Sequence, residues 1–260
     1  MMGKGSHPAG PEPRTHDQKV MVAREISDRL LRHYGDSVKA IALYGSVARG
    51  TDGPYSDVEL YCILDGEKID KTYEWGHGPW KAQVNVYSED IILRDAGVVD
   101  ETWPLVQRGY VDTEPLFDPN DLFSRVREIA CETSRTDFKP WIRDLIVGEI
   151  YELVGKVRNE FDSGSVSVTV LGVDIVKYCA FLIGLANRHM YTSGSQMLKE
   201  SMQCPDRPVG YDALCSRVIS GELGDVKQVG DEVDCLWSGI EKWAQDNDIR
   251  IYEDLAALLE

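Results

Sequence analysis

Two short apolar segments, joined through a glycine-serine turn, constrain the fold of this chain more than any other feature. The segment 38–43 reads VKAIAL, which is typical of a buried strand, and Gly45 and Ser46 follow it almost directly. A second strand is predicted over 58–64. Free backbone N–H groups and a hydroxyl at the turn after a strand can bind phosphate oxygens. The pattern therefore predicts an anion site at a strand end.

Two carboxylates, Asp57 and Glu59, stand at the start of the second predicted strand. Residues two apart share a face of a strand, so both side chains aim at one point. At a separation of about 4 Å, two such charges repel by roughly 4 kcal/mol at an effective dielectric of 20, a cost that bound Mg²⁺ removes. A phosphate site beside a metal-binding pair indicates nucleotidyl transfer. Taken alone, neither the Gly-Ser turn nor the region before the carboxylates requires a function. Gly-Ser after a strand is common, and the segment 51–54 (TDGP) is an ordinary turn signature.

Composition restricts the partners of the chain. Its 260 residues include 28 Lys and Arg against 44 Asp and Glu, for a net charge of −16. Such a charge repels nucleic acid and attracts a polycation, which disfavours a polymerase or a poly(A)-adding enzyme, although an acidic surface also serves solubility. The six cysteines show no C-x-x-C pair, and we predict reduced core thiols in a cytoplasmic protein; they are Cys62, Cys131, Cys179, Cys204, Cys215 and Cys235.

The ends of the chain and its apolar runs indicate neither export nor a membrane. Residues 1–16 are rich in Gly and Pro and are predicted to be a flexible tail. The longest apolar run, Tyr178–Ala186, is far shorter than the roughly 20 residues that a membrane span requires. The fold is predicted to begin at Asp17, as the N-cap of a helix that Gly35 ends.

Periodicity divides the rest of the chain into two domains. Alternation over 81–87 predicts a half-buried strand, helical spacing returns from Ser88, and we assign Trp103 and Tyr110 to the same α/β half. From Asp121 the pattern is helical: 168–185 is apolar nearly all round, and apolar residues recur at steps of three and four in Val226, Val229, Val233, Leu236, Ile240 and Trp243. We predict an α+β fold with a mixed-sheet domain at 17–120 and a helical bundle at 121–260, the boundary falling between Leu116 and Arg125.

The run from Tyr44 to Glu59 (YGSVARGTDGPYSDVE) resembles the aminoglycoside 4′-O-nucleotidyltransferases, the kanamycin nucleotidyltransferase group of the DNA polymerase β superfamily. Similar residues continue in order and at near-constant spacing from about residue 17 to about residue 245. They include Glu74-Trp75, Trp80-Lys81, Val84-Asn85-Val86-Tyr87, Ile150-Tyr151-Glu152, Gly155-Lys156, Arg158-Asn159 and Tyr191-Thr192-Ser193. The resemblance implies a polymerase-β-like nucleotidyltransferase domain followed by a helical bundle.

The resemblance also implies a reaction and its groups. AMP would pass from ATP, or another nucleoside triphosphate, to the 4′-hydroxyl of aminoglycosides such as kanamycin, tobramycin and amikacin, with release of pyrophosphate and resistance as the result. Asp57 and Glu59 would hold two Mg²⁺ ions, and Glu152 would be the general base. The triphosphate would contact Gly45, Ser46, Arg49, Ser56, Lys156 and Ser193. The cationic drug would meet Glu59, Glu74, Gln83, Glu149 and Glu152.

Several of these residues could instead serve the fold alone, without contacting a substrate. By spacing alone, Glu149, Glu152 and Lys156 could form a solvated helix face, with a Glu152–Lys156 pair contributing about 0.2–0.5 kcal/mol. Arg49 and Ser56 suit a turn, and Ser193 suits the N-cap of the next helix. Gln83 departs from the family, in which the corresponding position is often acidic, and this puts a drug contact and any third metal ligand in doubt.

The resemblance further implies a homodimer whose active sites each draw residues from both subunits. Two other functions fit parts of the pattern. A nucleotidyltransferase of the same fold could act on another acceptor, as an AMP-transferring antitoxin does, and would need no acidic drug pocket. A non-catalytic nucleotide- or drug-binding module is compatible with the neutral Gln83.

Overall fold

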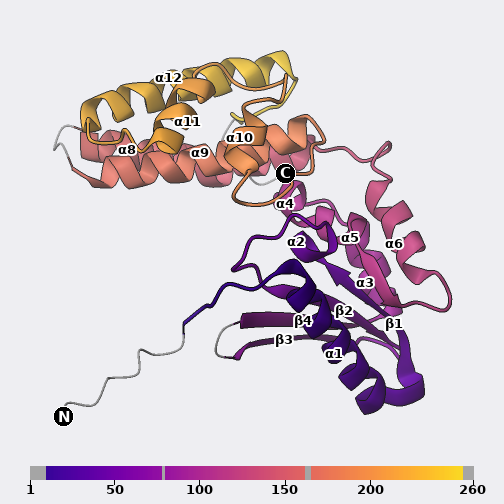
Figure 1. Ribbon diagram of the computed structural model, residues 1–260. Helices are drawn as coiled ribbons and strands as arrows, with labels where there is room; N and C mark the ends of the chain where they lie inside the picture. Colours follow the sequence, from indigo (N-terminus) through magenta and orange to yellow (C-terminus); the bar gives the residue numbers. More distant parts are fainter. Residues whose placement is uncertain (1–9, 78–79, 162–164, 254–260) are drawn as a thin grey trace, which may run out of the picture. The chain divides into compact units, whose positions relative to one another are not determined.

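The computed structural model describes residues 10–77, 80–161 and 165–253 (Figure 1). These residues form two compact units. The sheet unit comprises the described residues up to Val98 together with Gln107–Arg135. The helical unit comprises Val99–Val106 and the described residues from Thr136 onward. The predicted fold class, a mixed sheet with helices followed by a helical region, is confirmed.

The sheet unit contains a five-stranded mixed sheet in the order β3-β4-β2-β1-β5. Strands β2 and β4 are parallel, and the other neighbours are antiparallel. The strands are β1 Val38–Tyr44, β2 Val58–Leu64, β3 Asp70–His77, β4 Trp80–Ser88 and β5 Glu114–Phe117. The sequence patterns predicted β1, β2 and β4 only. Strand β3 carries exposed side chains over residues 71–76, so apolar alternation could not reveal it.

Helices cover both faces of the sheet. Helix α1 (His16–Tyr34) packs Ala23 and Ile26 against one face, which is formed by alternate residues of β1, β2 and β4. The opposite face packs against α3 (Glu89–Ala96) and α6 (Leu122–Cys131), through residues such as Ile92 and Phe123. Figure 1 shows α1 and α3 on opposite sides of the strands. Short turns complete the unit: the 3₁₀ helix Gly35–Ser37, α2 Gly45–Ala48 and α5 Arg108–Val111.

Helix α1 begins earlier than predicted. Its N-cap is Thr15 rather than Asp17, because Thr15 and Gln18 form a reciprocal capping box. The Thr15 hydroxyl accepts from the Gln18 N–H at 3.3 Å, and the Gln18 side chain accepts from the Thr15 N–H at 3.0 Å. The helix therefore starts inside the predicted tail, of which residues 1–9 lie outside the described part of the chain. Gly35 caps the C-terminus with φ of +56°, as predicted.

The two units do not divide at residue 120. Helix α6 belongs to the sheet unit, because Leu122, Phe123 and Val126 pack beneath the strands. The short helix α4 (Trp103–Val106) belongs to the helical unit, where the Trp103 ring meets that of Phe138 edge-on at 5.1 Å. The assignment of Trp103 to the α/β half was therefore wrong.

The helical unit is built around α9 (Ser167–Ala186), whose buried residues contact the other long helices. Those helices include α8 (Tyr151–Phe161), which continues from α7 (Lys139–Asp144) through a π-helical segment at Leu145–Ile150. The unit is completed by α10 Met197–Ser201, α11 Tyr211–Ser220 and α12 Val226–Asp246. The buried helix predicted at 168–185 and the apolar stripe of α12 are both confirmed.

Within the described residues, α9 is the one helix long and apolar enough to cross a membrane, with a mean hydropathy of 1.9. Central helices of helical bundles can have the same composition, and slightly more than half of this apolar segment is buried within the structure. The cysteines also differ in part from the prediction. Cys131 and Cys235 are exposed rather than part of the core, whereas the other four are buried, and all six are free thiols.

Candidate active site

One row of the sheet carries three of the predicted site residues. Glu59 of β2 stands opposite Tyr44 of β1 on one side and Gln83 of β4 on the other, and Gln83 in turn stands opposite Glu74 of β3. The sheet order therefore places Glu59, Gln83 and Glu74 side by side. The parallel pairing of β2 with β4 creates this row, because it aligns the starts of two strands that are separated in sequence.

The Asp57–Glu59 pair is electrostatically strained in the absence of a cation. Burial, followed by the neighbouring Asp57 charge, raises the pKa of Glu59 to about 7, while Arg49 and Lys81 act in the opposite direction. No group of three or more His, Cys, Asp or Glu side chains gathers as a metal site in the described part of the chain. Two carboxylates fit Mg²⁺ when phosphates and water supply the other oxygens, which is how this ion is usually held beside nucleotides.

Gly45 brings the backbone close to this pair. It is the first residue of α2 and has φ of +76°, and a Cβ atom at this position would overlap the Glu59 carboxylate oxygen Oε2. Ser46 follows it in the same turn of helix. The predicted phosphate turn therefore lies against Glu59, one member of the predicted metal pair, although the two residues are fourteen positions apart in the sequence.

Arg49 is held next to the same turn with part of its donor capacity unused. Its Nε is buried and has no hydrogen-bond partner among the described residues, and Nη1 lies 3.8 Å from the Asp112 carboxylate. An unsatisfied buried donor of this kind is costly, and a bound anion would satisfy it. Ser56 has a structural role, because its hydroxyl accepts from the Gly53 N–H at 3.0 Å and closes the turn before Asp57.

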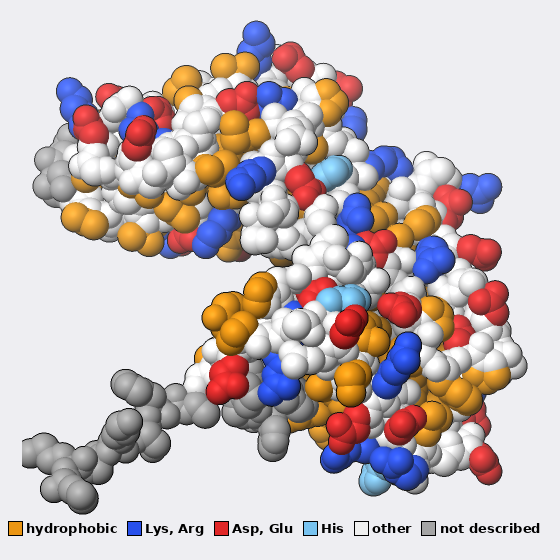
Figure 2. Space-filling view, in the orientation of Figure 1, with side chains coloured by type: hydrophobic (Ala, Val, Ile, Leu, Met, Phe, Trp, Pro, Cys, Tyr) orange, Lys and Arg blue, Asp and Glu red, His pale blue; other side chains and the backbone are white. Residues whose placement is uncertain are grey.

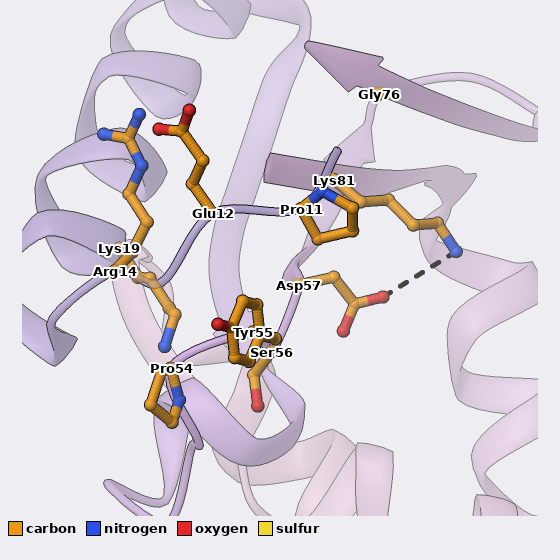
Figure 3. A pocket seen from close by; sticks show the side chains of 10 residues that line it. All are labelled: Pro11, Glu12, Arg14, Lys19, Pro54, Tyr55, Ser56, Asp57, Gly76 and Lys81. Carbon is orange, nitrogen blue, oxygen red and sulfur yellow. Dashed lines mark ion pairs between the residues drawn. The ribbon is translucent and has the colours of Figure 1, made fainter. Parts of the chain in front are cut away.

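Lys81 is a member of the site that the sequence patterns did not single out. Its ammonium lies 2.9 Å from Glu74 and 3.7 Å from Asp57. Figure 3 shows the Asp57 carboxylate directed toward this ammonium. The hydrogen bond to Glu74 is the main cause that raises the pKa of Lys81. Beside it lies a pocket of about 380 Å³ lined by Pro11, Glu12, Arg14, Lys19, Pro54, Tyr55, Ser56, Asp57, Gly76 and Lys81.

Gln83 is fixed by hydrogen bonds on the sheet surface. Its Nε2 donates to the Tyr44 hydroxyl and to Asn85 Oδ1, each at 3.3 Å, and Asn85 Nδ2 donates to the same hydroxyl at 2.9 Å. A glutamate could not make these two donations. The glutamine at this position is therefore held by a local network, while Glu74 remains exposed beside it.

The remaining predicted residues lie in the helical unit. Glu152 and Lys156 form an exposed i,i+4 ion pair of 2.6 Å, and the hydrogen bond from Lys156 lowers the pKa of Glu152. Glu149 is exposed in the π-helical segment, one turn earlier. Ser193 precedes α10, but the residue at the N-cap of this helix is Gln196, so the N-cap alternative for Ser193 is wrong.

The structure thus separates the predicted site into two groups. Around Glu59, the sheet unit gathers Gly45, Ser46, Arg49, Ser56, Asp57, Glu74 and Gln83. The helical unit carries Glu149, Glu152, Lys156 and Ser193. Acidic and basic side chains are interspersed over both units on the face shown in Figure 2. On that face, the net charge of −16 is not concentrated in a single patch.

Two family models match the two groups of predicted site residues separately, although the second match also includes α6 of the sheet unit. The family described as "Nucleotidyltransferase domain" matches residues 23–108, and "KNTase C-terminal domain" matches residues 120–250. A solved nucleotidyltransferase-like protein from Exiguobacterium sibiricum is 12% identical with a TM-score of 0.52, and the match covers 86% of this chain and 75% of that one. At this identity the likeness concerns the fold alone.

Two curated relatives cover nearly the whole chain. Both are called aminoglycoside nucleotidyltransferase (4′), one from Staphylococcus aureus and one from a Bacillus species. Each is 37% identical over 237 residues, which is 91% of this chain and 94% of the relative. With the carboxylate pair, the glycine turn and the two-unit fold in the same chain, this similarity shows that the protein is an enzyme of the aminoglycoside 4′-nucleotidyltransferase family.

Proposed function

We propose that the protein transfers AMP from ATP to the 4′-hydroxyl of aminoglycosides such as kanamycin, tobramycin and amikacin, in the presence of Mg²⁺ and with release of pyrophosphate. The observation that carries this proposal is that Glu59, whose pKa the Asp57 charge helps to raise, lies against the Gly45 turn. The relatives supply the reaction class, and the pair supplies a place where a metal-bound triphosphate can react. Because ATP is held inside the cell, the reaction belongs in the cytoplasm.

Asp57 and Glu59 would hold two Mg²⁺ ions. Bound there, the metal would neutralise phosphate charge and polarise the α-phosphorus toward an in-line displacement. The side chains and backbone of the protein would position the triphosphate and balance its charge. Gly45 and Ser46 present their backbone and hydroxyl groups to the phosphates, and the buried Nε of Arg49 supplies a donor that has no other partner among the described residues. Ser56 holds the turn that leads into Asp57.

Glu152 would accept the proton of the attacking sugar hydroxyl. Glu152 is ionised at neutral pH, but while the hydrogen bond from Lys156 lowers its pKa it is a weaker base than a free glutamate. Lys156 would leave this pair to contact the triphosphate, and Ser193 would contact it from the loop before α10. In the proposed homodimer, Glu152 and Lys156 of one subunit complete the Asp57–Glu59 site of the other.

The drug brings several ammonium groups, each of which needs an anionic or neutral acceptor when it leaves water. Glu74 and Glu59 line one row of the sheet, with the Gln83 side chain between them. Glu149 and Glu152 would add charge from the helical unit. We propose that Gln83 accepts a hydrogen bond from one ammonium group of the drug, which a neutral amide would bind more weakly than a carboxylate would.

Pyrophosphate release with ATP, Mg²⁺ and kanamycin tests the proposal. Release that depends on the drug is the expected result, and release only with another acceptor, or binding without turnover, would contradict it. Asp57→Asn should lower the rate by a factor of at least about 10² because a metal ligand is lost. Glu67→Gln removes an exposed carboxylate from a loop of the same unit and should leave the rate unchanged. Mass spectrometry of the modified drug identifies the hydroxyl.

A further inference from the structure

The segment that leads into Asp57 has no regular secondary structure, and a buried ion pair ties it to α1. The Lys19 ammonium lies 2.7 Å from Asp52 Oδ2 and donates to the Gly53 carbonyl oxygen at 2.5 Å. Both side chains are almost completely covered, with 3% of Lys19 and 2% of Asp52 exposed. Lysine and aspartate are rarely buried to this degree unless they are paired.

Further contacts strengthen the same junction. His16 Nδ1 lies 2.7 Å from the second Asp52 oxygen, and the Arg14 N–H donates to the Pro54 carbonyl oxygen at 2.8 Å. Burial by itself would raise the pKa of Asp52, but hydrogen bonds from Lys19 and His16 outweigh it, and the pKa lies below its usual value. Asp52 therefore stays ionised in its buried position.

Lys19 acts on the turn that precedes the proposed metal ligand. The Gly53 carbonyl that it contacts also accepts from the Ser56 N–H at 3.1 Å, and the Ser56 hydroxyl accepts from the Gly53 N–H. Lys19 thus holds the first residue of a turn whose last residue is next to Asp57. The buried pair is not required for stability on general grounds, since apolar replacement of such pairs is often neutral or stabilising.

We propose that Lys19, together with Asp52, is a positioning residue that holds the 52–56 turn so that Asp57 meets Glu59 in a metal-binding arrangement. The proposal rests on the proposed function of the Asp57–Glu59 pair. It assigns the pair a role at the active site although neither Lys19 nor Asp52 would touch the metal. Outer-shell groups of this kind commonly change metal affinity by about 10–100-fold when they are removed.

Mn²⁺ binding, measured by electron paramagnetic resonance on the full chain without nucleotide, separates positioning from mere stability. Lys19→Met leaves the buried Asp52 carboxylate with His16 as its remaining side-chain partner, so it should lower the melting temperature and weaken Mn²⁺ binding by about tenfold or more. The double variant Lys19→Met/Asp52→Leu removes both buried charges. It should regain much of the melting temperature while Mn²⁺ binding stays weak, because the turn is still not held. Lys19→Arg should retain most of the affinity.

Arg29→Met is the matched control, because it removes an exposed ion pair with Glu25 from the same helix and should change neither quantity. If the double variant regains parental Mn²⁺ affinity, or if Lys19→Met binds Mn²⁺ like the parent, the positioning role is wrong. Should Lys19→Met fail to fold, the double variant and Lys19→Arg still decide the question. If Asp57→Asn binds Mn²⁺ as well as the parent does, the metal site itself fails, and with it the proposed function.

Discussion

Gly45 and Glu59 depend on each other, and this dependence can be tested. Gly45→Ala would place a methyl group against the Glu59 carboxylate, in addition to the cost of about 1–2 kcal/mol for a non-glycine residue with positive φ. We expect a lower melting temperature and a loss of drug-dependent turnover. Gly50→Ala is the control, because Gly50 has φ of +64° but open space around its Cβ position. It should lose stability and keep its activity; equal activity in the two variants would contradict this account.

The raised pKa of Glu59 predicts a pH dependence of stability in the metal-free protein. The folded-state pKa of about 7 lies above the ordinary value of 4.5, so this group favours folding below pH 4.5 and loses that contribution as the pH rises through 7. Urea unfolding in EDTA should therefore show that Glu59→Gln gains stability over the parent at pH 8 and much less at pH 5. An equal gain at both pH values would show that the pKa of Glu59 is not raised in the folded protein.

At this scale the sequence could predict the carboxylate pair but not its surroundings. The expectation that Asp57 and Glu59 share a face rests on the period of two in an extended segment and needs no knowledge of tertiary structure, although β2 begins one residue after Asp57. The ion pair of Lys81 with Asp57, and the bond from Gln83 to Tyr44, depend on β4 lying next to β2. Strand order across a sheet is not encoded in local periodicity, so these contacts required the structure.

For the helices too, local periodicity predicts part of the structure and misses what depends on tertiary packing. The spacing of apolar residues over 142–157 predicts a buried stripe of Ile142, Ile146, Ile150, Leu153 and Val157. Four of these residues are buried, but Val154 is buried in place of Leu153. The reason is the π-helical segment Leu145–Ile150, whose wider turn rotates the residues that follow. The period of 3.6 could predict a helix and its buried side, whereas a local change of period depends on packing against α9.

Close packing of α12 predicts unequal effects of two glycine substitutions. Gly239→Ala would drive a methyl group into the carbonyl oxygen of Val209, so the gain in helix propensity should be outweighed and the variant destabilised by about 1–3 kcal/mol. Gly155→Ala in α8 meets open space and should gain about 0.5–1 kcal/mol from propensity. Urea unfolding of the two variants measures both values. Destabilisation by Gly155→Ala would mean that this face of α8 is covered.

At the scale of the whole molecule, the proposed base Glu152 belongs to the helical unit, whereas the Asp57–Glu59 pair belongs to the sheet unit. It lies on an exposed helix face, and the neighbouring Tyr151 and Val147 are also exposed, with exposed fractions of 53% and 37%. Beside them is an apolar hollow of about 110 Å³ that includes Trp237 and Tyr252. Contiguous exposed apolar groups rimmed by polar residues are typical of an interaction surface. This arrangement supports the proposed homodimer in which the helical unit faces a partner's nucleotide.

Mixed dimers of Asp57→Asn and Glu152→Gln chains test that arrangement. Each variant alone should be inactive, because every site lacks either a metal ligand or the base. In a heterodimer with shared sites, one site receives both substitutions and the other receives none. Random exchange should then restore about a quarter of parental turnover, since half of the dimers are mixed and half of their sites are intact. The rate is measured after the two chains are unfolded and refolded together, with separately refolded chains combined just before the assay as the control. If each site is formed within a single chain, the refolded mixture will be no more active than either variant alone.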